Sequence, residues 1–188
     1  MKVRSWTTQL AVIGAALITG CAAEPSVPTA QPGHEAHTAA TQVISVELER
    51  ALATLKRLTR PYRSLPAAMA AGYNAQLTGC MELPPAGGMG FHYGDVRLID
   101  AVVDPLRPEI LMYEPQANGD LLFVGVEYVV PYSVWPHQEP PHLLGVPFHR
   151  NDTFQLWVLH AWIWKSNPAG MLADWNPRVT CKFAKPTT

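Results

Sequence analysis

The chain has 188 residues, a length that fits one domain of ordinary size with a substantial hydrophobic core. Hydrophobic residues make up 48% of the chain and charged residues only 15%, which excludes a charge-rich disordered protein. The formal net charge is −1 and no basic stripe is visible, which argues against a nucleic-acid-binding protein.

The N-terminus carries the pattern of an export signal. Lys2 and Arg4 precede a short apolar stretch at residues 10–18, and the sequence Ile-Thr-Gly-Cys follows, ending at Cys21. This ending resembles a bacterial lipobox, in which the cysteine thiol is acylated and the cysteine becomes the first residue of the mature protein. The stretch is shorter than the ~20 residues that a membrane-spanning helix needs. The sequence therefore predicts a lipoprotein signal peptide over residues 1–20.

The predicted lipid on Cys21 places the protein in the bacterial cell envelope and makes the membrane its expected partner. Several acyl chains hold a protein on a bilayer much more firmly than one chain does. Ala22 follows the cysteine, where an Asp is absent, and this resembles the sorting pattern for the periplasmic face of the outer membrane in Gram-negative bacteria. Residues 21–42 contain few large apolar side chains, so we expect a disordered tether there.

The three cysteines suggest one disulfide. If Cys21 carries lipid, Cys80 and Cys181 remain in a compartment that permits disulfide formation. They are not spaced as the Cys-x-x-Cys pair of a redox site. We therefore predict a structural disulfide between Cys80 and Cys181, closing a loop of about 100 residues.

Residues 43–184 are predicted to form a single globular domain that begins with helices. Apolar residues from Ile44 to Leu58 recur at steps of three and four, which predicts an amphipathic helix. A short second helix is expected from Ser64 to Gly72.

The later part of the domain is rich in β-branched and aromatic residues, as strands are. The predicted strands are residues 109–115, 121–131 and 154–165. Asn118-Gly119 predicts a hairpin turn between the first two strands. The predicted loops are residues 80–95, 131–153 and 166–181. This order predicts an α+β fold, with N-terminal helices followed by a mainly antiparallel β-sheet.

Three polar side chains stand in apolar surroundings: His92, Glu127 and His160. Strand alternation predicts that Glu127 shares a face with Phe123, Gly125 and Val129, and His160 with Leu156, Val158, Trp162 and Trp164. A buried carboxylate is costly unless it is paired or bound to a metal. Two imidazoles and one carboxylate are donors used by open zinc and non-haem iron sites. We therefore predict a site for one transition metal ion (zinc, copper or iron); the alternative is that these residues are structural.

Further residues suggest a ligand pocket near this site. Trp135, His149 and Trp162 are the predicted ligand-binding residues, because an aromatic wall and a loop histidine suit a pocket mouth. The fingerprints of serine hydrolases, P-loop proteins and dinucleotide-binding enzymes are absent from the sequence, so no enzyme class is assigned. The alternative function is a non-catalytic envelope lipoprotein that binds a protein or apolar partner through an aromatic-rich surface.

Four segments carry a resemblance to a family. They are GCMELPPAGGMGFHYGD, DPLRPEILMYEP, LFVGVEY and LHAWIWKSNPAGMLADWNPRVTC. Together they resemble an uncharacterised family of exported bacterial proteins across residues 60–181. The resemblance implies export and adds no specific chemistry.

Overall fold

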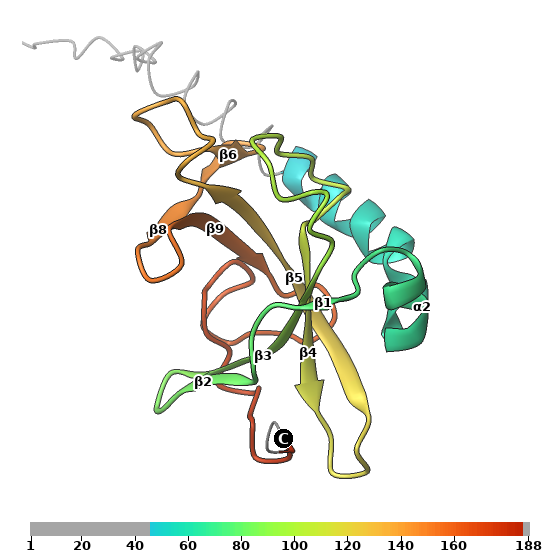
Figure 1. Cartoon of the computed structure of the whole chain (residues 1–188). Helices are drawn as coiled ribbons and strands as arrows, with labels where there is room; N and C mark the ends of the chain where they lie inside the picture. The colour runs from blue at the N-terminus through green and yellow to red at the C-terminus, as the bar shows by residue number, and fades with distance from the viewer. Residues whose placement is uncertain (1–45, 186–188) are drawn as a thin grey trace, which may run out of the picture.

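The computed structural model describes residues 46–185 and is mainly an antiparallel β-sheet accompanied by few helices (Figure 1). Six strands lie in the order β1-β3-β4-β5-β9-β8, and β2 also pairs with β3. The predicted antiparallel sheet is confirmed. The predicted signal peptide and tether, and Cys21 with them, lie outside the described residues.

The helices come first in the described chain and lie on one side of the sheet. The first helix occupies residues 46–58 of the described range, and the 3-10 helix η1 (Arg60–Arg63) and α2 (Leu65–Ala70) follow it. Ser64 occupies the N-cap position of α2 and a proline lies in its first turn, as the sequence predicts. Among the helices of residues 46–185, none is both long and apolar enough to cross a membrane.

The strands extend beyond the three that the sequence predicts. Their bounds are β1 (Ala75–Gln76), β2 (Met81–Leu83), β3 (Gly87–Gly94), β4 (Ile110–Pro115), β5 (Leu121–Pro131), β6 (His142–Leu143), β7 (Val146–Pro147), β8 (His149–Asn151) and β9 (Leu156–Ala161). The predicted strands at 109–115 and 121–131 and their hairpin are confirmed, with Gly119 at φ 88° in the turn. β9 ends earlier than predicted. The predicted loop at 131–153 contains three short strands, β6 to β8.

The prediction of a loop at residues 80–95 is wrong, because β2 and β3 form a hairpin there. Glycines make β3 possible, because the neighbouring backbone leaves no room for side chains at their positions. A Cβ atom on Gly90 would lie 2.2 Å from the carbonyl oxygen of Tyr113, and one on Gly87 would lie 2.2 Å from that of Asn176. The glycine-rich composition thus reflects close approach of strands and not a loop.

The two faces of the sheet carry different cores. The larger core lies on the helix face, and a β-bulge in β5 decides which residues join it. β4 pairs with Phe123 and Gly125 but skips Val124. Because one inserted residue reverses the alternation, Phe123 packs in the helix-side core with Val126, and Val124 packs elsewhere. The prediction that Phe123 shares a face with Glu127 is therefore wrong.

The alternation predicted for β9 also fails near its end. Val158 and Trp162 pack in the smaller clusters on the face away from the helices, in keeping with the prediction for His160. Trp164 instead joins the helix-side core, with its ring 6.1 Å from that of Phe123. The strand ends at Ala161, so the period of two does not continue to Trp164.

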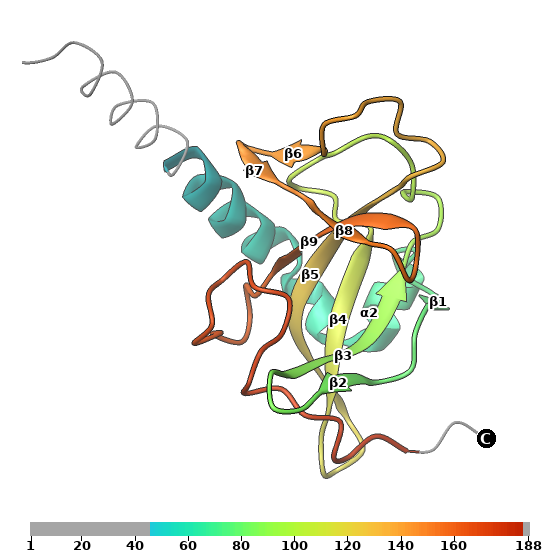
Figure 2. The ribbon, with the colours of Figure 1, turned by 90° about the vertical axis from the view of Figure 1, so that its left-hand side faces the viewer.

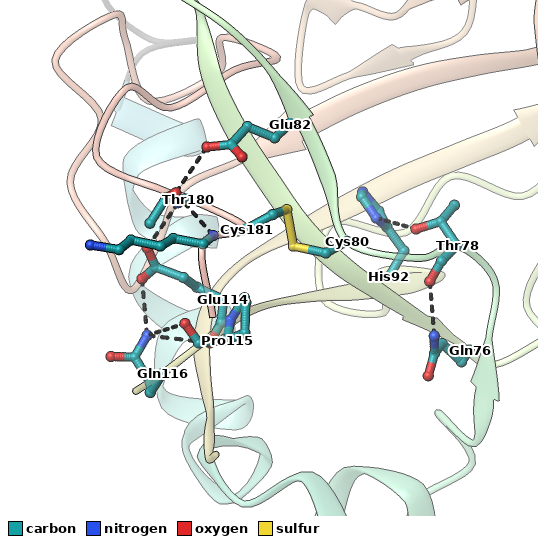
Figure 3. The surroundings of a disulfide bond; sticks show 11 residues. Gln76, Thr78, Cys80, Glu82, His92, Glu114, Pro115, Gln116, Thr180 and Cys181 are labelled. Carbon is teal, nitrogen blue, oxygen red and sulfur yellow. Dashed lines mark hydrogen bonds between the residues drawn. A yellow bond between two sulfur atoms is a disulfide. The ribbon is translucent and has the colours of Figure 1, made fainter. Parts of the chain in front are cut away.

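The predicted disulfide between Cys80 and Cys181 is confirmed, with the two Cα atoms 5.7 Å apart (Figure 3). It fastens the start of β2 to the C-terminal segment, 101 residues further along the chain. Buried Glu114 holds the same segment, because it pairs with Lys165 and accepts a hydrogen bond from the backbone N–H of Thr180. Residues 166–181 are thus fixed to the sheet although they contain no strand.

Candidate metal-binding site

The structure brings His92, Glu127 and His160 together on the sheet face away from the helices. Figure 2 views the sheet from this side, with α2 behind it. His92 comes from β3, Glu127 from β5 and His160 from β9, and Glu127 and His160 are directly paired across the two strands. One ligand atom from each residue lies within 4.8 Å of the others. All three residues are buried, with exposed fractions of 3%, 7% and 2% in chain order.

The distances within this cluster fit a shared ion better than direct hydrogen bonds. Nε2 of His92 lies 3.5 Å from Oε2 of Glu127, and Nε2 of His160 lies 3.5 Å from Oε1 of the same carboxylate. Good N–H···O hydrogen bonds are about 2.7–3.2 Å long. Two donor atoms that each lie about 2.1 Å from one ion are about 3.4 Å apart at a tetrahedral angle. Buried His and Glu groups that could hold a metal ion are therefore present.

One buried nitrogen of the cluster lacks a partner. Nε2 of His160 has no hydrogen bond to any of the described residues. Leaving such a polar atom unsatisfied costs about 1–3 kcal/mol. The same atom points toward the Glu127 carboxylate, so a cation between the two would satisfy both groups.

The other ring nitrogen of each histidine contacts a protein oxygen. Nδ1 of His92 lies 2.8 Å from the hydroxyl oxygen of Thr78, a contact drawn in Figure 3. Nδ1 of His160 lies 3.1 Å from Oδ1 of Asp174. In the tautomer whose Nδ1–H donates to these oxygens, Nε2 carries no proton. Its lone pair is then available to a metal ion.

Burial and charge act differently on the two histidines. Burial lowers the pKa of His92, and nearby Glu127 offsets only part of this effect. Burial also lowers the pKa of His160, but the carboxylates of Glu127 and Asp174 outweigh it, so the net shift is upward. Burial raises the pKa of Asp174, yet its bonds to His149 and His160 bring it well below the usual range. Asp174 is therefore an anion at neutral pH, and a metal ion at Nε2 of His160 would compete with a proton for that nitrogen.

His149 belongs to the outer layer of this site. Its Nε2 lies 2.7 Å from Oδ1 of Asp174, and its ring is stacked against that of His160 with centroids 6.4 Å apart. His149, His160 and Asp174 form a second group that could hold a metal, but it is more exposed than the first. In the arrangement described above, Asp174 already uses its Oδ1 to hold both rings.

The sequence did not predict Thr78 and Asp174 as contacts of the candidate ligands. Thr78 lies in an unremarkable stretch, where no local pattern indicates a contact with His92. Asp174 lies in a predicted loop. The one indication in the sequence is indirect: a buried imidazole such as that of His160 needs an acceptor for its second nitrogen. Trp162 helps to place it, because its backbone N–H donates to Met171 and its indole N–H donates to the carbonyl oxygen of Ala173.

A cavity of about 230 Å³ adjoins the three candidate ligands, which form part of its wall. Most of the remaining wall is apolar and includes Met89, Ile99, Ile110, Val129 and Leu156. A metal ion held by three protein ligands leaves a coordination position free. Such an ion could polarise a bound oxygen or lower the pKa of a bound water at this cavity.

None of the three predicted ligand-binding residues, Trp135, His149 and Trp162, lines this cavity. Trp135 lies in the segment after β5, where its indole N–H donates to the carbonyl oxygen of Glu139. Trp162 is buried against Met112 and, as described above, holds the C-terminal segment. Both rings are used for packing and their N–H groups are satisfied by backbone. His149 alone of the three adjoins the candidate ligands.

Comparisons of the chain with protein-family models, with curated proteins and with solved structures found no match. The resemblance to exported bacterial proteins therefore remains a prediction. The function has to be argued from the geometry of the site.

Proposed function

We propose that this protein binds one divalent transition metal ion through Nε2 of His92, a carboxylate oxygen of Glu127 and Nε2 of His160. The observation that carries the proposal is the buried Nε2 of His160, which faces a carboxylate at 3.5 Å without a hydrogen bond among the described residues. Zinc, iron(II) and copper(II) all accept imidazole and carboxylate donors. The ion would present an open position to the adjoining cavity and act there as a Lewis acid.

Replacement of His160 by Ala tests the proposal. Full-length wild-type protein, prepared without a polyhistidine tag, is expected to take up one ion per chain in an equilibrium titration read by elemental analysis. His160→Ala removes one of three ligands, so we expect at least a hundredfold loss of affinity. His142→Ala is the matched control, because His142 is exposed and lies in the separate β6–β7 ribbon.

The two histidine variants together define the result that would contradict the proposal. His142→Ala should bind as the wild type does, and both variants should retain the far-ultraviolet circular dichroism of the sheet. The proposal is wrong if wild-type protein binds no ion, or if His160→Ala binds as tightly as His142→Ala.

We further infer that lipid on Cys21 anchors the domain in the cell envelope. The basic start, the short apolar stretch and the Ile-Thr-Gly-Cys ending support this inference, and the disulfide is compatible with an oxidising compartment. Cys21→Ser should accumulate as an unprocessed precursor, because the acceptor thiol is missing. Normal processing and membrane retention of this variant would contradict the anchor.

The alternative of a partner-binding aromatic surface receives less support. Such a surface needs large aromatic side chains that are free to contact a partner. The tryptophans of residues 46–185 are all buried or half-buried. Trp157 and Trp162 are buried, and the cationic side chains of Lys56 and Arg63 lie over the ring of Trp164.

A further inference from the structure

We propose that the open position of the metal ion receives a small molecule that carries one anionic donor group on an uncharged, apolar body. This inference rests on the proposed function, because the ion supplies the contact to the donor group. The wall, size and opening of the adjoining cavity each restrict what can bind there.

The wall excludes a charged body. Apart from the candidate ligands, the polar side chains that line the cavity are those of Thr78 and Asn151, and the hydroxyl of Thr78 is already engaged by His92. No Lys or Arg of the described residues lines it. A second charge on the ligand would thus be buried without a partner, which is costly. Apolar surface of a ligand, in contrast, is stabilised when it leaves water for this wall.

The volume limits the size of the body. An apolar cavity of about 150 Å³ is large enough to bind benzene. The present cavity measures about 230 Å³. It therefore has room for one ring or a short branched chain together with a donor group, and not for a nucleotide or a sugar chain.

The charge of the loaded site sets the character of the donor. A divalent ion together with its three protein ligands, two neutral imidazoles and the Glu127 carboxylate, carries a net charge of +1, and the Asp174 anion lies outside these ligands, against Nδ1 of His160. A buried charge of this kind is stabilised by an opposite charge in direct contact. A carboxylate, phenolate, thiolate or hydroxamate group supplies that charge, whereas a neutral donor does not.

Two of the side chains that line the cavity are also exposed at the surface. Phe154, in the loop between β8 and β9, is 48% exposed, and Leu77, which follows β1, is 39% exposed. The adjacent Gln155 has φ 57°, a left-handed conformation that is uncommon for a non-glycine residue and fixes the turn that carries Phe154. An apolar ligand thus meets apolar side chains from the surface to the ion.

Hydroxamates of different bodies test the inference, because they share one metal-binding group. Full-length protein is loaded with Co²⁺, and binding is followed by the visible absorption of the ion. We expect benzohydroxamate to bind about tenfold or more tightly than acetohydroxamate. We expect 4-carboxybenzohydroxamate to lose about tenfold or more relative to benzohydroxamate, because its second charge enters the apolar wall. Equal affinities for the benzo and aceto compounds, or for the charged and uncharged rings, would overturn the inference.

Two cavity variants locate the bound ring. Ile99→Glu places a charge in the wall and should reduce the preference for benzohydroxamate to within about threefold of acetohydroxamate. Val102→Glu is the matched control, because Val102 lies in the same loop but is 65% exposed and does not line the cavity. If Ile99→Glu fails to fold, Phe154→Ala at the exposed rim should still weaken the preference several-fold. A wild-type preference in folded Ile99→Glu or Phe154→Ala would show that the ring binds elsewhere and overturn the inference.

Failure of the proposed function gives a different result. If wild-type protein takes up no Co²⁺, the metal site is wrong, and so is the claim that an anionic donor group binds to the ion. The cavity is then tested in metal-free protein with benzyl alcohol, followed by nuclear magnetic resonance of the wall methyl groups. Binding that Ile99→Glu removes would support an apolar ligand, and no binding would overturn the cavity as well.

Discussion

At the scale of single residues, each candidate histidine ligand uses one ring nitrogen for the site and the other for a protein oxygen. His92 contacts Thr78 and His160 contacts Asp174 through Nδ1, which leaves both Nε2 atoms facing Glu127. The sequence predicted the three central residues because polar side chains in apolar strands need partners. It could not predict the outer partners, since Thr78 and Asp174 lie in segments without a regular period.

Asp174→Asn should weaken metal binding by about 10- to 100-fold, because the anion that holds the His160 ring is lost. Burial lowers the pKa of His160 and the carboxylates raise it, so loss of one carboxylate lowers it. Protons compete with the ion only below that pKa. The pH at which uptake fails should therefore shift downward in the variant, an effect that a purely structural defect would not produce.

Metal titrations between pH 5 and 8 measure both effects. Asp120→Asn is the control, because Asp120 is exposed at the β4–β5 turn. An Asp174→Asn profile identical to that of Asp120→Asn would show that Asp174 does not act on His160.

At the scale of elements, the strand that carries His92 depends on glycine. The sequence predicted β4 and β5 from their continuous apolar residues, but it misread β3 as a loop, because glycine normally interrupts strands. The β3–β4 contact at Gly90 explains the difference, since the neighbouring backbone occupies the place of a side chain. The bulge at Val124 is likewise absent from any sequence pattern, and it moved Phe123 to the opposite face.

Gly90→Ala should lower the free energy of unfolding by about 2 kcal/mol or more. The φ of Gly90 is 85°, and the added Cβ would meet the backbone oxygen of Tyr113 at 2.2 Å. Gly79→Ala is the matched control, because a Cβ there meets nothing within 4 Å. Urea denaturation measures the difference, and equal stabilities of the two variants would contradict this account of β3.

At the scale of the whole molecule, the two faces of the sheet differ in what they carry. The helices and the larger core stabilise one face, whereas the other holds buried ionisable groups and the cavity. The disulfide and the Glu114 contacts fix the C-terminal segment, which brings Asp174 to the site. The sequence predicted the antiparallel sheet because apolar runs are local signals, and it predicted the disulfide because Cys80 and Cys181 are the two cysteines that remain once Cys21 is assigned to lipid. The cavity depends on how distant segments meet, so no local signal reports it.

Stability should depend on pH through Glu109, a buried carboxyl group outside the candidate metal site. Burial raises its pKa to about 8, although it accepts a hydrogen bond from the backbone N–H of Val129. A raised pKa in the folded state stabilises the fold below the ordinary value of 4.5, and this contribution is lost as pH rises toward 8. Each pH unit in this window then costs up to about 1.4 kcal/mol.

Glu109→Gln removes this titration and should flatten the fall in unfolding free energy between pH 5 and 8. Urea denaturation at several pH values measures the slope. Glu139→Gln, at an exposed position, is the control and should keep the wild-type slope. Equal slopes for wild-type protein and Glu109→Gln would contradict a protonated Glu109 in the fold.

The most direct test of the metal site is the anomalous diffraction map of a crystal of zinc-loaded protein. We predict one strong peak about 2.0–2.2 Å from Nε2 of His92, Nε2 of His160 and an oxygen of Glu127, with further coordination density on the cavity side. A peak at His149 and Asp174 instead, or no peak at either group at saturating zinc, would contradict the proposed function.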